Sequence, residues 1–392
     1  MDIFDSRYFQ INRLTLSCVG LWVYQSAAKK RLAKALIFLS LTTTLIPQIN
    51  FLFSVWGDID AVFECLPPFG LVLISASQLC LFAYHNKKLL SLVECMKRDW
   101  KVWSSGKELE ILQIHAEEGK YFTLLYTGIV FGAVFMFVLM SLSPIVLDRI
   151  IPLNETRPKQ LVYAAKFPFN QDEYFEWIVV HGAITSFYNM SIIYSCEGML
   201  GVTTQHACGL FAIISYRLKN IIKLNEENVC RQEQLAEDKI YKEISSTIYL
   251  HNQALEYAKT LNSCYSHFLF MTVGLNVLTL SVSGIQTINA LGNTEKTIKF
   301  GAPMLGCFIH LYFISLPAQN LTDCSLNVTN DVYNGLWYLF PIKSRKLLIL
   351  IIRRSQNPCY LTAGKICTMG MVSFSSLVQT SLSYFTLLSS VR

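Results

Sequence analysis

The C-terminal stretch of the chain carries a row of hydroxyl side chains at helical spacing. On a helix, one face of this stretch presents Ser373, Ser376, Thr380, Ser383, Leu387 and Val391. Hydroxyls can replace part of an ion's hydration shell, and aliphatic side chains can close a pore by excluding water. The pattern therefore predicts a pore helix gated by Leu387 and Val391, and we place Tyr384 among its lining residues. The same stripe is equally typical of membrane helices that pack through small polar side chains.

A pore helix needs a membrane around it, and the composition indicates one. Of the 392 residues, 52% are hydrophobic and only 15% are charged, which is unlike a soluble domain. Seven apolar runs are long enough for a span of about 20 residues. They cover residues 35–56, 61–84, 121–147, 177–195, 266–291, 300–321 and 366–391. We expect no signal peptide, because the basic cluster at residues 29–34 leads directly into a run of full spanning length.

The distribution of positive charge predicts the orientation. Most of the 33 lysines and arginines fall in segments on the same side as the N-terminus, so this side is cytosolic and the C-terminus is extracellular. The net charge of +6 calls for no nucleic acid, because cations that flank the membrane account for it. The sequon at Asn154 lies outside and is predicted to be glycosylated, whereas those at Asn320 and Asn327 lie inside.

Helical patterns continue beyond the membrane. The fourth run extends without proline to about residue 225, which is far longer than a hydrocarbon core of about 30 Å requires. Residues 226–261 repeat apolar side chains at near-helical spacing. We therefore expect cytosolic helix extensions on which subunits can pack. Within one domain, residues 1–321 hold spans one to six and the ligand pocket, residues 322–365 form a cytosolic anchor segment, and residues 366–392 form the last helix.

Aromatic and basic side chains crowd the segment before the last span. The members that we single out are Tyr333, Trp337, Tyr338, Lys343, Arg345 and Arg354. The basic residues flank an apolar run at 347–352 that is far too short to cross a membrane. A cytosolic helix at a subunit interface explains this pattern, and a short helix lying on the lipid surface explains it as well.

The final fifth of the chain resembles the C-terminal signature of insect odorant receptors. The matching strings are Trp337-Tyr338, residues 343–352, Arg354-Ser355-Gln356, Pro358, Leu361-Thr362-Ala363-Gly364 and Ser383-Tyr384-Phe385-Thr386-Leu387-Leu388, and the likeness extends to His251, Leu255, Cys324 and Tyr333. The resemblance implies an all-α membrane protein with seven transmembrane helices in inverted topology and cytosolic extensions that form an anchor. It also implies a tetrameric, ligand-gated, non-selective cation channel whose last helix lines the pore, with its gate at Leu387 and Val391.

The chain length is similar to that of ligand-specific tuning subunits, because the odorant co-receptor carries a longer cytosolic insertion. The resemblance thus implies a hetero-oligomer with the co-receptor in the plasma membrane of olfactory sensory neuron dendrites, with no cofactor and no G protein. A gustatory-type receptor channel is the nearest alternative, although the Gln-Phe pattern of its last helix is missing after Tyr384. A polytopic transporter is the other alternative, but no inverted repeat is visible.

A small volatile ligand needs a mainly apolar pocket with a few polar groups. By depth in the outer half of spans two to six, the candidates are Phe69, Leu73, Phe135, Val138, His181, Thr185, Tyr188 and Ser283. Each of these residues could equally serve only in packing.

Two other classes fit the sequence poorly. Asp148-Arg149-Ile150 and Asn357-Pro358-Cys359-Tyr360 resemble motifs of G-protein-coupled receptors, but the second precedes its span and that class requires the opposite orientation. The histidines share no metal-ligand spacing, and no paired carboxylates, Gly-rich loop or nucleophile motif occur, so we expect no enzyme and no metal site.

Overall fold

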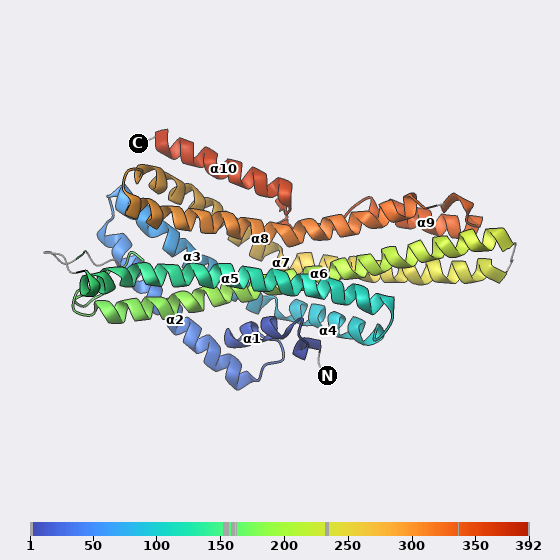
Figure 1. The fold of residues 1–392 in the computed structure, drawn as a ribbon, viewed down its shortest axis with the longest axis horizontal. Coiled ribbons are helices and arrows are strands. Elements are labelled where there is room, and N and C mark those ends of the chain that lie inside the picture. The colour runs from blue at the N-terminus through green and yellow to red at the C-terminus, as the bar shows by residue number, and fades with distance from the viewer. Residues whose placement is uncertain are drawn as a thin grey trace.

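The molecule is almost entirely helical and elongated (Figure 1). The computed structural model describes residues 3–151, 157, 161, 163–231, 235–335 and 337–390. Its elements are η1 (Ile3–Asp5), α1 (Gln10–Cys18), α2 (Ala27–Ser54), α3 (Ile59–Tyr84), α4 (Asn86–Val102), α5 (Lys107–Ile150), α6 (Phe175–Arg231), α7 (Leu235–Asn289), α8 (Thr294–Tyr333), η2 (Trp337–Leu339), α9 (Ile342–Ser355), β1 (Thr362–Ala363), β2 (Cys367–Thr368) and α10 (Met371–Ser390).

Two helices are far longer than a membrane crossing. α6 has 57 residues and α7 has 55, so each is on the order of 80 Å long at about 1.5 Å per residue. This confirms that the fourth apolar run belongs to a helix longer than a hydrocarbon core. From Leu235 onward the predicted helix at 226–261 runs into the predicted fifth span as one helix, α7, because no proline or left-handed residue separates them, whereas residues 226–231 belong to α6. The adjoining ends of α6 and α7 lie beside α9 at one end of the molecule (Figure 1).

Within the described residues, five helices are long and apolar enough to cross a membrane: α2, α3, α5, the part Glu237–Asn289 of α7 and the part Lys296–Tyr333 of α8. The predicted fourth and seventh spans lie in α6 and α10, which are not among these five. The count of seven spans and the inverted topology therefore stay predictions at this point.

α6 is the central helix of the bundle. Every residue from 191 to 211 is buried, so this segment has no solvent-facing stripe. Its glycines allow α5 to approach closely: a Cβ on Gly201 would lie 2.6 Å from the Phe122 ring, and one on Gly209 would lie 3.1 Å from Leu112. Polar side chains that point from α6 are therefore surrounded by neighbouring helices, and each needs a partner there.

A short β-hairpin leads into the last helix. Thr362 of β1 pairs with Thr368 of β2, and the intervening Gly364 and Lys365 both have left-handed backbones, with φ of 62° and 63°. The Gly364 N–H donates to the Ser266 carbonyl on α7 at 2.9 Å. The prediction that the last helix includes Ile366 is wrong, since two left-handed residues stop a right-handed helix and α10 begins at Met371.

Candidate functional site

The hydroxyl face of α10 points away from its own subunit. α10 packs against α7 and α8 through Phe374, Leu377 and the buried Ser381, whose carbonyl accepts a hydrogen bond from the Ser281 hydroxyl at 3.1 Å. Ser376, Thr380, Ser383 and Tyr384 are exposed, and Ser373 is half-buried with its hydroxyl bonded to the Thr368 carbonyl. The stripe is therefore not what holds α10 to the rest of the chain.

One further residue belongs to this exposed face. Gln379 is exposed between Ser376 and Ser383, at helical spacing from both, and was missed because only hydroxyl side chains were expected there. The sequence could have shown it, since Gln379 lies three positions after Ser376 on the same helical face. The predicted gate lies at the far end of the helix: Leu387 falls within α10, but its side chain and all of Val391 are outside the described residues.

The half of the bundle that contains the start of α6 brings several predicted pocket residues together. His181, Thr185 and Tyr188 follow one another along α6, and Thr185 is buried. The His181 ring Nε2 lies 3.0 Å from the Thr43 hydroxyl of α2. The Tyr163 hydroxyl, from the segment before α6, lies beside Thr44 and Thr185. Thr43, Thr44 and Tyr163 were missed from the sequence because nothing there shows that α2 and the 163 segment cover this face of α6.

The remaining pocket candidates are spread over three helices. Phe69 and Leu73 on α3 are half-buried, as is Val138 on α5, whereas Phe135 is 63% exposed and lies on the outer surface of the chain. Ser283 on α7 is fully buried, and its hydroxyl has no hydrogen-bond partner within the described part of the chain. A buried hydroxyl without a partner is costly, so a ligand or a water would stabilise it.

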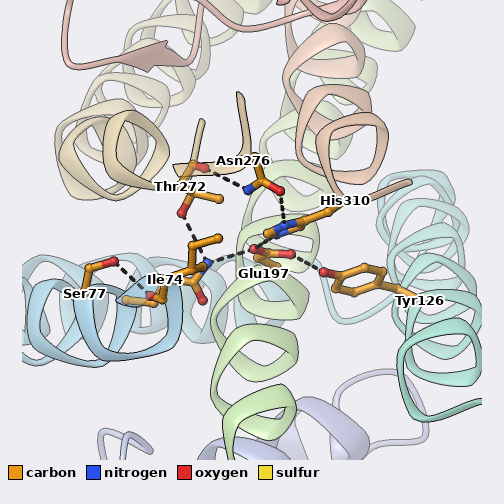
Figure 2. Close-up of polar contacts among 8 residues, drawn as sticks. Ile74, Ser77, Tyr126, Glu197, Thr272, Asn276 and His310 are labelled. Carbon is orange, nitrogen blue, oxygen red and sulfur yellow. Dashed lines mark hydrogen bonds and ion pairs between the residues drawn. The ribbon is translucent and has the colours of Figure 1, made fainter. Parts of the chain in front are cut away.

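A second polar cluster lies deeper in the bundle and joins five helices (Figure 2). Its centre is Glu197 of α6, which is 2% exposed. One carboxylate oxygen, Oε2, accepts from the Tyr126 hydroxyl of α5 at 2.5 Å. The other, Oε1, accepts from the Gln78 amide of α3 at 2.9 Å and lies 2.5 Å from Nε2 of His310 on α8.

α7 completes the cluster from the far side of His310. The His310 Nδ1 lies 3.1 Å from Oδ1 of Asn276, and the Asn276 amide donates to the Thr272 carbonyl at 2.7 Å. In the sequence His310 stands isolated and nothing pairs it with Glu197, because the two are 113 positions apart. The signal that could have pointed to Glu197 is a single carboxylate within the apolar part of α6. No group of three possible metal ligands occurs among the described residues.

The anchor segment is partly buried and partly exposed. Trp337 packs against the core, whereas Tyr333 and Tyr338 are 65% and 54% exposed. On α9, Ser344, Leu348 and Ile351 are buried, while Lys343 and Arg354 are exposed and Arg345 is half-buried. α9 thus keeps one face on the bundle and presents a basic, aromatic-flanked face outward. Asn154, predicted to be glycosylated, is outside the described residues.

Two buried polar contacts hold together the half of the bundle that contains α4 and α9. Asp99 of α4 accepts from Arg98 at 3.0 Å and lies 3.1 Å from Nε2 of His206 on α6, and both the Asp99 and His206 side chains are almost fully buried. His251 of α7 lies 3.3 Å from the Ser355 hydroxyl of α9 and is 2% exposed. Both contacts tie α6 or α7 to a neighbouring shorter helix, α4 or α9.

His251 predicts acid sensitivity of the half of the bundle that contains α4 and α9. Burial, and secondarily the positive charge of Arg354, lower the pKa of His251 from 6.5 to about 4. The folded state therefore binds fewer protons than the unfolded state between these values, so the His251 contribution is complete above pH 6.5 and is lost as the pH falls toward 4. At about 1.4 kcal/mol per pKa unit, the loss is about 3 kcal/mol.

Thermal unfolding of the detergent-solubilised protein from pH 7 to pH 4 measures this loss. A His251→Gln variant should show a flatter pH profile, because its side chain does not titrate. Parallel profiles for the two proteins would assign the acid sensitivity to other groups.

Comparisons with known proteins agree on one family. The family model described as 7tm Odorant receptor matches residues 58–382. The chain is 23% identical to Odorant receptor 9a of Drosophila melanogaster over 326 residues, 79% of this chain and 76% of the relative. It is 20% identical to Odorant receptor 13a of the same species over 375 residues, 91% and 86% of the two chains.

A solved structure has the same fold. The insect olfactory receptor OR5 from Machilis hrabei in complex with eugenol aligns with a TM-score of 0.76 at 14% sequence identity, covering 98% of this chain and 97% of that one. A second structure of the same receptor aligns with a TM-score of 0.73. At this identity the likeness concerns the fold, which is the one described above.

Proposed function

The chain belongs to the 7tm odorant receptor family of insects, and from that premise we propose that it is the tuning subunit of an odorant-gated, non-selective cation channel. In this proposal seven helices cross the membrane, the N-terminus is cytosolic, and α10 is the seventh span and lines a central pore. The subunit assembles with the odorant co-receptor, as a tetramer, through the cytosolic ends of α6 to α9. Its place is the plasma membrane of olfactory sensory neuron dendrites.

The observation that carries the proposal is the exposed polar face of α10. Ser376, Gln379, Thr380 and Ser383 offer neutral oxygens and no acidic side chain, which suits weak selectivity among cations. Thr380 and Ser383 donate to carbonyls one turn back, at Ser376 and Gln379, whereas the Gln379 side-chain amide favours water or another polar group over lipid. A shared pore between subunits would provide both. Leu387 and Val391, one and two turns further along, are the proposed hydrophobic gate.

The proposed ligand is a small volatile molecule with one polar group. His181, Thr43, Thr44 and Tyr163 supply donors and acceptors in the outer half, and the buried Ser283 hydroxyl supplies another. The structurally similar Machilis receptor was solved in complex with eugenol. Each methylene that the pocket buries contributes about 0.8 kcal/mol. Binding opens the channel only if the ligand binds the open arrangement more tightly.

Two-electrode recording from cells that express the chain with and without the co-receptor tests this function. We expect a panel of volatiles to evoke cation currents only when the co-receptor is present. Leu387→Ala and Val391→Ala should raise the standing current, because each removes part of the water-excluding constriction. Leu382→Ala is the matched control: Leu382 is exposed on α10 but lies off the polar face, so its gating should not change.

Silence of the wild-type chain with the co-receptor, despite surface expression and a broad panel, would contradict the proposal. It would then favour a gustatory-type receptor or a transporter. Currents from the chain without any partner would show that it is not a tuning subunit.

A further inference from the structure

The hydrogen bonds around His310 hold its ring in one orientation. The Asn276 amide nitrogen donates to the Thr272 carbonyl, so Asn276 turns its oxygen toward Nδ1 of His310, at 3.1 Å. The opposite nitrogen, Nε2, lies 2.5 Å from Oε1 of Glu197. The ring is therefore held on both sides, by α7 and by α6.

Glu197 is held from two further helices. Tyr126 and Gln78 both donate to its carboxylate, at 2.5 and 2.9 Å. The side chains of Glu197 and His310 are 2% and 11% exposed. Breaking their contact is costly, because burial leaves neither side chain with water as an alternative partner.

The pair joins α6 to the helices that carry α10. Glu197 stands on the segment of α6 that is buried on all sides, whereas His310 stands on α8 and its partner Asn276 on α7. α10 packs on these same two helices and is bonded to α7 at Ser281. A displacement of α10 that shifted α7 and α8 away from α6 would stretch the contact between Glu197 and His310, so the pair would resist it.

We propose that Glu197 and His310 are a positioning pair that holds α7 and α8 against α6 and thereby opposes opening of the pore by α10. The inference rests on the proposed channel function and assigns to that channel a buried element that sets its resting balance. Weakening the pair favours the open arrangement, so less ligand is needed and more channels open without it. The pair touches neither ligand nor ion, and it acts only through the helices it joins.

Recording of the full receptor with its co-receptor, using the volatile that gives the largest wild-type current, tests the pair. Glu197→Gln keeps the side-chain volume and removes the charge. We expect it to lower the half-maximal volatile concentration about fivefold or more and to raise the standing current. His310→Asn should do the same, and the double variant should resemble either single one, because both remove one interaction. Glu197→Asp, which keeps the charge, should restore part of the wild-type response.

Two tyrosines provide a matched control. Tyr126→Phe removes a hydroxyl that donates to Glu197 and should shift the response in the same direction by a smaller factor. Tyr257→Phe also removes a buried hydroxyl between helices, one that donates to the Thr203 carbonyl at 3.2 Å, but it does not touch the pair and should leave the response unchanged.

Each alternative outcome is distinct. A purely structural role would reduce the number of channels at the surface and leave the half-maximal concentration at its wild-type value, which would overturn the inference. Additive shifts in the double variant would overturn it as well, since the two residues would then act separately. A silent wild-type receptor would remove the proposed function and this inference together, whereas a conducting wild type with unchanged variants would remove the inference alone.

Discussion

Gly364→Ala is expected to destabilise the protein strongly, and the turn between β1 and β2 explains why. Gly364 has a φ of 62°, in the left-handed region, where an L-residue costs about 1–2 kcal/mol. The added Cβ would also lie 2.9 Å from the Phe270 ring and 3.2 Å from the Phe270 Cβ on α7. Overpacking of this kind costs a further 1–3 kcal/mol or so. The temperature at which the solubilised protein loses its monodisperse chromatographic peak should fall accordingly.

Gly274→Ala is the matched control, because Gly274 lies on α7, the helix that the turn contacts. Nothing lies within 4 Å of the Cβ that it would add. Because alanine favours a helix interior over glycine by about 0.5–1 kcal/mol, this variant should be neutral or slightly more stable. Equal losses in the two variants would mean that the turn has no special role.

Asp99→Ala is expected to cost on the order of 3–5 kcal/mol, the range for breaking a buried ionic contact by removing one partner. The substitution leaves Nε2 of His206 without its acceptor at a site that is 2% exposed, and it removes the acceptor of Arg98. α4 and α6 are joined at this point, so α4 should loosen from the bundle. Hydrogen exchange of α4, compared between variant and wild type, reports this directly.

Glu110→Ala provides the comparison on the surface. Glu110 pairs with Lys107 at 2.5 Å, and both side chains are more than half exposed. Water replaces such a partner readily, so the expected loss is below about 1 kcal/mol. If the two substitutions had the same effect, burial would not be what makes the Asp99 contact important.

The helical repeat of apolar side chains made much of the fold predictable. Helices beyond the membrane length followed from uninterrupted patterns, and the short basic-flanked run became α9 with its apolar side buried. Local sequence also contained the exposed hydroxyl face of α10, because helical spacing alone places Ser376, Thr380 and Ser383 together. These features depend on residues close in the chain.

Pairings between distant residues were not predictable. The contact between Glu197 and His310, and that between Asp99 and His206, depend on which helices become neighbours, which one sequence does not state. The start of α10 was misjudged for a different reason. Ile366 reads as the beginning of an apolar run, but the left-handed turn at Gly364 and Lys365 is held by contacts with α7 that only the folded chain supplies.

The order of residues along the chain has a consequence for how the cluster around Glu197 forms. Gln78 on α3 and Tyr126 on α5 precede Glu197, whereas His310 on α8 follows it by 113 residues. During synthesis Glu197 can therefore meet its first two partners before the third has been made. His310 completes the cluster only when α8 joins the bundle.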